Sequence, residues 1–151
     1  TDISLGKCYR IWTPLISPGY CWYNNDEIEF KEEYGALYNW YAVKTGDLCP
    51  SGWHVPDDYE WTVIEAYLGG SEIAGGKMKE TKDTHWKSPN TKATNESGFT
   101  ALPGGSRGDQ ALFIDIGELS IFWTSSWDLV DKAYYRSLSF SGSDLANELS
   151  F

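Results

Sequence analysis

The chain has 151 residues, 41% of them hydrophobic, which is enough for one domain with a buried core. Its 22 acidic and 12 basic residues give a net charge of −10, which argues against binding to nucleic acid or to an anionic membrane surface. The sequence has no apolar run of about 18 residues, so we expect no membrane insertion. The eight Trp residues raise the question of which rings build the core and which face a ligand.

The N-terminal part of the chain is predicted to be extended and turn-rich, followed by a first helix. Residues 7–12 alternate polar and larger apolar side chains, which favours a strand with one buried face. The first helix is predicted over residues 28–43, because apolar side chains recur there at helical spacing. These side chains are Tyr34, Leu37, Tyr38 and Tyr41.

A second helix is predicted to begin after Pro56. Asp57 is a suitable N-cap, and Glu60 completes the pattern of a capping box. The pair Gly69 and Gly70 ends the helix, because glycine readily adopts the left-handed conformation of a C-terminal cap.

From residue 71 onward the helical pattern fades, and glycine and proline residues mark a long loop region. Three strands are then predicted, at residues 112–116, 120–125 and 133–140. We therefore expect an α+β fold in which two helices pack on a small, mostly antiparallel, twisted sheet with a long loop region.

Several long motifs occur in one order along the chain. They include YGALYNWYAV (34–43), LCPSGWHVPDDYEW (48–61), SPNTKATNESGFTALPGG (88–105) and FWTSS (122–126). In these motifs the chain resembles the Fibrobacter succinogenes major paralogous domain over roughly residues 18–145. The resemblance predicts one domain over residues 1–151, with an N-terminal strand segment at 1–20 and the family-matching body at 21–145.

The resemblance implies a C-type-lectin-like fold, in the branch that contains the formylglycine-generating enzymes. Those enzymes use a pair of late cysteines to bind copper, and this chain has no cysteine after Cys49. His54 at a helix entrance and His85 in a polar loop form no catalytic constellation in the sequence, so we expect no enzyme and no catalytic residue.

Neither a metal site nor a cofactor is expected. The sugar-binding calcium loops of C-type lectins contain a carboxylate that the Ser88-Pro89-Asn90 segment lacks. Capping of the first helix accounts for Asn24, Asn25 and Asp26. Calcium stays an alternative without support in the residues.

The resemblance also implies a disulfide. Members of the family end with a cysteine-containing strand close to G-F-S-V-R-C-V, which is missing before Phe151. Residues 5–11 are similar to that strand, so we expect them to take its place, with Cys8 paired to Cys49. The alternatives are a Cys8–Cys21 pair, three free thiols, or a final strand that lies outside this sequence. Completion of the sheet by a neighbouring subunit would make the protein a homo-oligomer, such as a trimeric fibre tip.

Lectin-like domains contact ligands through the loops and strands of their second half, which makes the late aromatic and charged residues the candidate ligand site. Trp127 follows a Thr-Ser-Ser run in an apparent loop, so it is the ring we most expect to be exposed. The full candidate set is Trp127, Asp128, Arg107, Asp109, Tyr134, Arg136 and Trp86. Trp40, Trp53, Trp61 and Trp123 are expected to belong to the scaffold.

The sequence thus predicts a non-catalytic recognition module, extracellular or on a bacterial cell surface, that binds a glycan or a protein on another surface. An adhesin or fibre tip would have this role. The alternatives are an assembly module without its own ligand and a degenerate enzyme of the formylglycine-generating type. The integrin-type tripeptide Arg107-Gly108-Asp109 is short enough to occur by chance.

Overall fold

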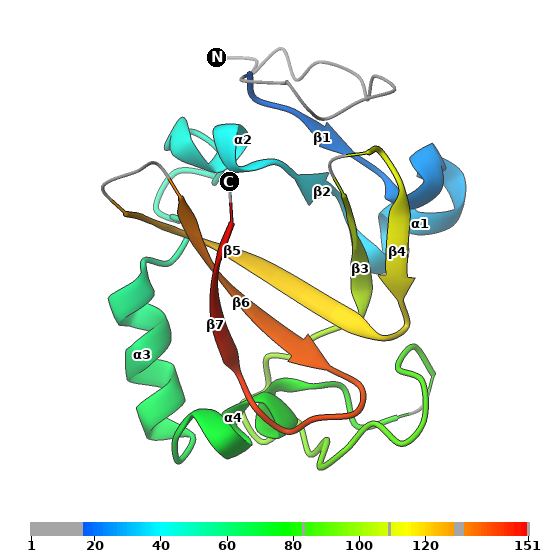
Figure 1. Ribbon diagram of the computed structural model, residues 1–151, viewed down its shortest axis with the longest axis vertical. Coiled ribbons are helices and arrows are strands. Elements are labelled where there is room, and N and C mark those ends of the chain that lie inside the picture. Colours follow the sequence, from blue (N-terminus) through cyan, green and yellow to red (C-terminus); the bar gives the residue numbers. More distant parts are fainter. Residues whose placement is uncertain (1–16, 83, 109, 129–131, 151) are drawn as a thin grey trace.

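The computed structural model describes residues 17–82, 84–108, 110–128 and 132–150. Its centre is a three-stranded antiparallel sheet with strand order β5-β6-β7, formed by Leu119–Trp127, Ala133–Ser139 and Ala146–Ser150. Helices α3 and α4 lie on one side of this sheet, while α2 and two short strand pairs lie around the rest of it (Figure 1). The predicted α+β class with antiparallel sheets is confirmed.

The two short strand pairs are also antiparallel. Strand β1 (Tyr20–Cys21) pairs with β2 (Leu37–Tyr38). Strand β3 (Gly104–Arg107) pairs with β4 (Phe113–Ile116). The strands predicted near residues 112–116, 120–125 and 133–140 are confirmed as β4, β5 and β6.

The helix predicted over residues 28–43 is wrong as a single element. The chain forms α1 (Glu27–Tyr34), then β2, then α2 (Trp40–Lys44). Gly35 adopts a φ of 72°, which ends α1, and the Asn39 side chain accepts a hydrogen bond from the Ala42 backbone to start α2. The aromatic spacing that suggested one helix therefore spans two helices and a strand.

The second predicted helix is confirmed as α3 (Asp58–Tyr67). The Asp57 carboxylate accepts from the Glu60 backbone N–H at 2.8 Å, and the Glu60 carboxylate accepts from the Asp57 backbone N–H at 2.9 Å. This capping box fixes where α3 begins, because two otherwise unpaired backbone donors are satisfied there.

Helix α4 (Ser71–Met78) was not predicted from the sequence. Its Gly75 and Gly76 disfavour a helix by propensity, but both lie against other backbone segments. A Cβ on Gly75 would lie 2.0 Å from the Asp144 carbonyl oxygen, and one on Gly76 would lie 2.5 Å from the Lys92 carbonyl oxygen. These glycines let α4 pack closely, so tertiary contacts override the local preference.

Strand β7 is a second element that the sequence did not predict. It pairs with β6 along its length, from Ser137 opposite Ala146 to Ala133 opposite Ser150. Among the described residues, β7 is therefore the strand at this edge of the sheet. Residues 5–11, which we expected to complete the sheet, lie outside the described residues.

The central sheet packs on both of its faces. On one face, Trp61 of α3 and Met78 of α4 form the larger core cluster together with Leu138 of β6. On the other face, Trp40 of α2 forms a smaller cluster with Ala133. Side chains of β6 alternate between these two environments, as the spacing of a strand requires.

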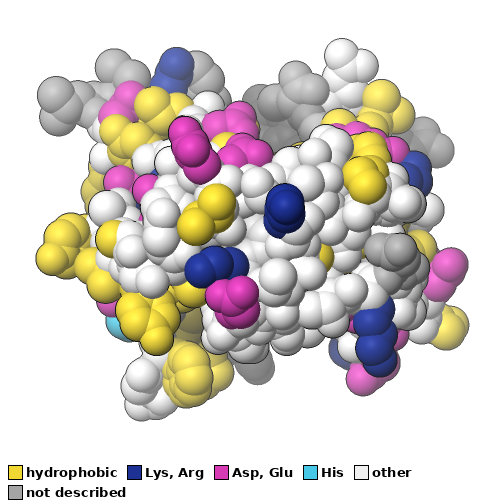
Figure 2. All heavy atoms as spheres, turned by 90° about the horizontal axis from the view of Figure 1, so that it is seen from below, with side chains coloured by type: hydrophobic (Ala, Val, Ile, Leu, Met, Phe, Trp, Pro, Cys, Tyr) yellow, Lys and Arg dark blue, Asp and Glu magenta, His cyan; other side chains and the backbone are white. Residues whose placement is uncertain are grey.

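Figure 2 shows the face formed by α4 and the loops around it. Hydrophobic side chains gather toward its rim, and single basic and acidic groups are interspersed over its centre. This face therefore presents neither a broad charged patch nor a central apolar patch among its described residues, and the candidate site lies elsewhere.

Candidate ligand-binding surface

The indole of Trp127 stands out from the end of β5. The residue is 53% exposed, so its predicted exposure is confirmed. Its ring centroid lies 6.1 Å from that of the buried Trp40, and the Lys44 ammonium lies 5.8 Å from the Trp127 ring centroid. Both contacts come from α2, so the helix holds an exposed ring in place and leaves part of its surface open.

A second indole, that of Trp53, is 77% exposed. We expected Trp53 to belong to the scaffold, and this prediction was wrong. The residue ends a turn in which its backbone N–H donates to the Pro50 carbonyl at 2.9 Å, and Gly52 adopts a φ of 88° within that turn. The turn directs the indole outward, and the Pro-x-Gly pattern before Trp53 is the sequence signal that could have indicated this.

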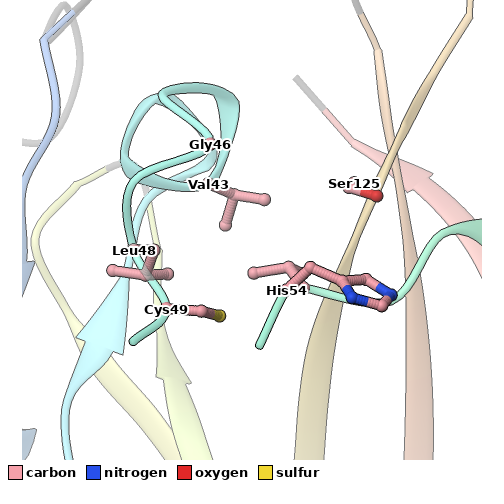
Figure 3. Close-up of a pocket in the computed structure, with 7 residues that line it drawn as sticks. Val43, Gly46, Leu48, Cys49, His54 and Ser125 are labelled. Carbon is pink, nitrogen blue, oxygen red and sulfur yellow. The ribbon is translucent and has the colours of Figure 1, made fainter. Parts of the chain in front are cut away.

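A small pocket of about 140 Å³ lies between these two parts of the chain. Val43 and Cys49 point toward the pocket from one wall, and His54 and Ser125 stand on the other (Figure 3). The complete lining is Val43, Gly46, Leu48, Cys49, His54, Val55 and Ser125. The volume is well below the roughly 300–1,000 Å³ of clefts that enclose small-molecule ligands.

The pocket and the two exposed indoles are neighbours along the chain. His54 directly follows Trp53, and Ser125 precedes Trp127 by two positions on β5. Val43 precedes Lys44, the residue whose ammonium lies over Trp127. We call the pocket together with Trp53 and Trp127 the two-tryptophan surface.

An exposed hydrogen-bonded contact between His54 and Glu60 borders this surface. The His54 Nε2 atom lies 2.9 Å from both carboxylate oxygens of Glu60. The Asp57 backbone N–H is the main cause that lowers the pKa of Glu60, and the hydrogen bond from His54 adds to it. The Glu60 carboxylate therefore makes two contacts. It accepts the capping hydrogen bond from the Asp57 backbone N–H, and it holds His54 beside the start of α3.

Trp86 and Arg136 are buried, which corrects their predicted place in the ligand site. Trp86 is 2% exposed, and its Nε1 donates to the Ala101 carbonyl at 2.8 Å. Arg136 is 1% exposed, and its Nη2 donates to the Asp58 carboxylate at 2.8 Å. Alternation along β6 turns Arg136 toward α3, so the packing of α3 excludes it from any ligand surface.

The remaining predicted residues do not form one site. Arg107 lies on β3, with its guanidinium 5.0 Å from the Phe113 ring centroid. Tyr134 is half-buried and lies two positions before Arg136 on β6. Asp128 adjoins Trp127 and its carboxylate accepts from the Lys132 backbone N–H at 2.9 Å. Asp109 lies outside the described residues. Of the predicted residues that the structure describes, only Trp127 belongs to the two-tryptophan surface, and Asp128 follows it directly in the chain.

The cysteines leave the predicted disulfide without support. Cys49 carries a free thiol at the pocket, and Cys8 lies outside the described residues. Cys21 is buried on β1. The Cys8–Cys49 pair stays a prediction.

Two kinds of feature are absent from the described parts of the chain. No group of His, Cys, Asp and Glu residues there could hold a metal ion. None of the helices within the described ranges is long and apolar enough to cross a membrane.

The chain matches the Fibrobacter succinogenes major domain over residues 9–147. Comparison with curated proteins gave no match, and neither did comparison with solved structures. The family match extends farther toward the N-terminus than the body predicted at 21–145, and it covers most of the sequence. The chain therefore belongs to the Fibrobacter succinogenes major domain family.

Proposed function

We propose that this chain is a non-catalytic recognition module that binds a glycan through the two-tryptophan surface. We further propose that its fold is C-type-lectin-like and that it works outside the cell or on a bacterial cell surface. The observation that carries the proposal is the exposure of two indoles, Trp53 at 77% and Trp127 at 53%, each within two positions of a residue that lines the same small pocket.

The chemistry of the surface suits sugar rings. Large aromatic faces combine apolar contact area with little conformational entropy, and a sugar ring has an apolar face that can stack on them. Leaving both indoles exposed has no benefit for folding, because burying such rings stabilises a domain. The small volume of the pocket, about 140 Å³, supports recognition of an exposed group rather than enclosure of a substrate.

Binding to a glycan array, followed by titration of the bound glycan, tests the proposal. Trp53→Ala and Trp127→Ala should each weaken binding by about 30-fold, which corresponds to the roughly 2 kcal/mol of an aromatic hot spot. Ile28→Ala is the control, because Ile28 is a large apolar side chain that is 96% exposed on α1. It should bind like the wild type.

Circular dichroism and thermal unfolding of each variant separate loss of binding from loss of fold. Trp53→Ala gives the cleaner result, since so exposed a ring contributes little to packing. The proposal would be abandoned if the wild-type protein bound no glycan, or if both Trp variants bound as strongly as the control. If the ligand is a protein, the wild-type chain should bind no glycan on the array, and its binding to the protein partner should weaken in Trp53→Ala and Trp127→Ala.

An assembly module without its own ligand is the second candidate, and one observation favours it. Tyr59, Val63 and Tyr67 are exposed and recur at four-residue intervals along α3, which makes an apolar stripe. If the chain assembles through this stripe, Tyr67→Ala should shift the oligomeric state measured by analytical ultracentrifugation, and Trp53→Ala should leave it unchanged.

A further inference from the structure

The face of the central sheet that carries Trp123 has a second group of polar and aromatic side chains. Trp123 of β5 lies opposite Tyr135 of β6, and Tyr135 lies opposite Glu148 of β7. Residues paired in this way project from the same face of a sheet, and Ser137 follows Tyr135 on that face. We call Trp123, Tyr135, Ser137 and Glu148 the sheet-face group.

Hydrogen bonds hold the carboxylate of this group in one orientation. The Tyr135 hydroxyl donates to one Glu148 carboxylate oxygen at 2.7 Å, and the Ser137 hydroxyl donates to the other at 2.9 Å. Glu148 is nevertheless exposed. Burial and the adjacent carboxylate raise the pKa of Tyr135 to about 12, so its hydroxyl stays a neutral donor. Each carboxylate oxygen keeps a lone pair for a further donor.

The aromatic members connect this group to the two-tryptophan surface. The Tyr135 ring lies 5.7 Å from the Trp123 ring in an edge-to-face arrangement. The buried Trp40 ring touches both Trp123 and Trp127, with a centroid distance of 6.1 Å to each. Trp127 lies on β5 and Glu148 lies two strands away on β7, a separation of about 10 Å across the sheet. The two groups are therefore too far apart for one sugar ring to contact both.

We propose that the sheet-face group is a second sugar subsite, so that the ligand is an uncharged oligosaccharide chain rather than a single terminal sugar. This inference rests on the proposed glycan-binding function. The oriented carboxylate of Glu148 accepts hydrogen bonds from neighbouring sugar hydroxyls, and the Tyr135 hydroxyl oxygen lies beside it as a further acceptor. Ser137 is 7% exposed and orients the carboxylate from within the sheet. A uronic acid would bring a second negative charge to Glu148, which lies in a chain of net charge −10.

Affinity measured against chain length tests this inference. The probes are cello-, xylo-, manno- and malto-oligosaccharides of one to six sugars, with oligogalacturonides of the same lengths as the anionic counterpart. For the neutral series that binds, affinity should rise at least tenfold from the single sugar to the longest chain. Oligogalacturonides should bind more weakly than neutral chains.

Two variants locate the second subsite. Glu148→Gln keeps the shape of the side chain but removes its charge, and Ser137→Ala removes one of the two hydroxyls that orient it. Each should weaken binding of the longest chain about tenfold and leave binding of the single sugar unchanged. Glu29→Gln is the matched control, because it makes the same change at an exposed position on α1.

The possible failures are distinguishable. The second subsite would be overturned if affinity did not depend on chain length. It would also be overturned if Glu148→Gln bound chains of every length as Glu29→Gln does. In either case, glycan binding that depends on Trp127 would still support the proposed function. Tighter binding of oligogalacturonides would overturn the uncharged class. A wild-type protein that bound none of these probes and no glycan on the array would overturn both proposals. Unfolding midpoints of Glu148→Gln and Ser137→Ala show whether a loss of binding is a loss of fold.

Discussion

Among single residues, Arg136 has the environment least expected for its side chain. Its guanidinium is 1% exposed, and one nitrogen donates to the Asp58 carboxylate. The Nε and Nη1 atoms are buried without a hydrogen-bond partner. A buried charge is stabilised mainly by its counter-ion, so the pair with Asp58 joins the start of α3 to β6.

Replacing Asp58 and replacing Arg136 should lower the stability of the fold by unequal amounts. Asp58→Asn leaves the buried guanidinium without a negative partner, which should lower the free energy of unfolding by about 3 kcal/mol. Arg136→Met removes the buried charge, and the Asp58 side chain, 32% exposed, can turn to water. Arg136→Met should therefore lower the free energy of unfolding by less than about 2 kcal/mol. Urea unfolding of both variants checks the ranking, and a larger loss for Arg136→Met would contradict it.

Among the elements, α1 is joined to the segment after α4 by one imidazole. His85 Nδ1 lies 2.8 Å from the Glu80 carboxylate, and its Nε2 lies 2.6 Å from the Glu33 carboxylate of α1. The ring of Tyr34, also on α1, packs edge-on against the imidazole at 5.7 Å. The hydrogen bond to Glu80 is the main cause that raises the pKa of His85, Glu33 raises it further, and burial opposes both.

The raised pKa predicts a dependence of stability on pH. A histidine whose pKa is higher in the folded state stabilises the fold fully below its unfolded value of about 6.5, and this contribution is lost as pH rises through the folded value. The difference in unfolding free energy between wild type and His85→Gln should therefore be largest near pH 5.5 and shrink toward pH 9. Urea titrations across this range check the prediction. A difference that stayed constant, or grew with pH, would refute it.

Across the whole molecule, α4 and the loop between β6 and β7 form one closely packed unit. Gly75 of α4 lies against the backbone of Asp144, and the Gly76 N–H donates to the Ser143 carbonyl at 2.9 Å. The Leu145 N–H donates to the Ser71 carbonyl at 2.8 Å. This contact places β7 at the edge of the sheet, and with it Glu148 of the sheet-face group.

Gly75→Ala should disrupt this unit. The added Cβ would meet the Asp144 carbonyl oxygen at 2.0 Å, a backbone atom that cannot move aside without shifting the loop. We expect a loss of about 3 kcal/mol or more in unfolding free energy. Gly19→Ala is the control, because its Cβ would make an ordinary contact at 3.5 Å with Asn39. Equal thermal midpoints for the two variants would show that α4 does not depend on this approach.

Several parts of the fold could be predicted because their signals are local. The capping box of Asp57 and Glu60, with the two glycines after α3, marks that helix within a short stretch. Alternation along a strand is equally local, and it places Tyr135 on the opposite face of β6 from Tyr134 and Arg136. The exposure of Trp127 was predicted from its place after a polar run.

Other parts depend on contacts between residues far apart in the sequence. Trp86 resembled a loop residue, but its nitrogen reaches the Ala101 carbonyl and its ring enters the core. Helix α4 contains glycines that only its close packing explains. Trp53 sits within a motif that suggested scaffold, yet its turn directs the ring to solvent.

The sequence by itself determined the family, the α+β class, the start of α3 and the strands β4 to β6, because long motifs, caps and side-chain alternation act over short stretches of chain. Only the tertiary structure decided that Trp53 is exposed, that Trp86 is buried and that Arg136 faces Asp58. The physical reason is that burial is a property of what packs against a side chain, and its packing partners here come from distant segments.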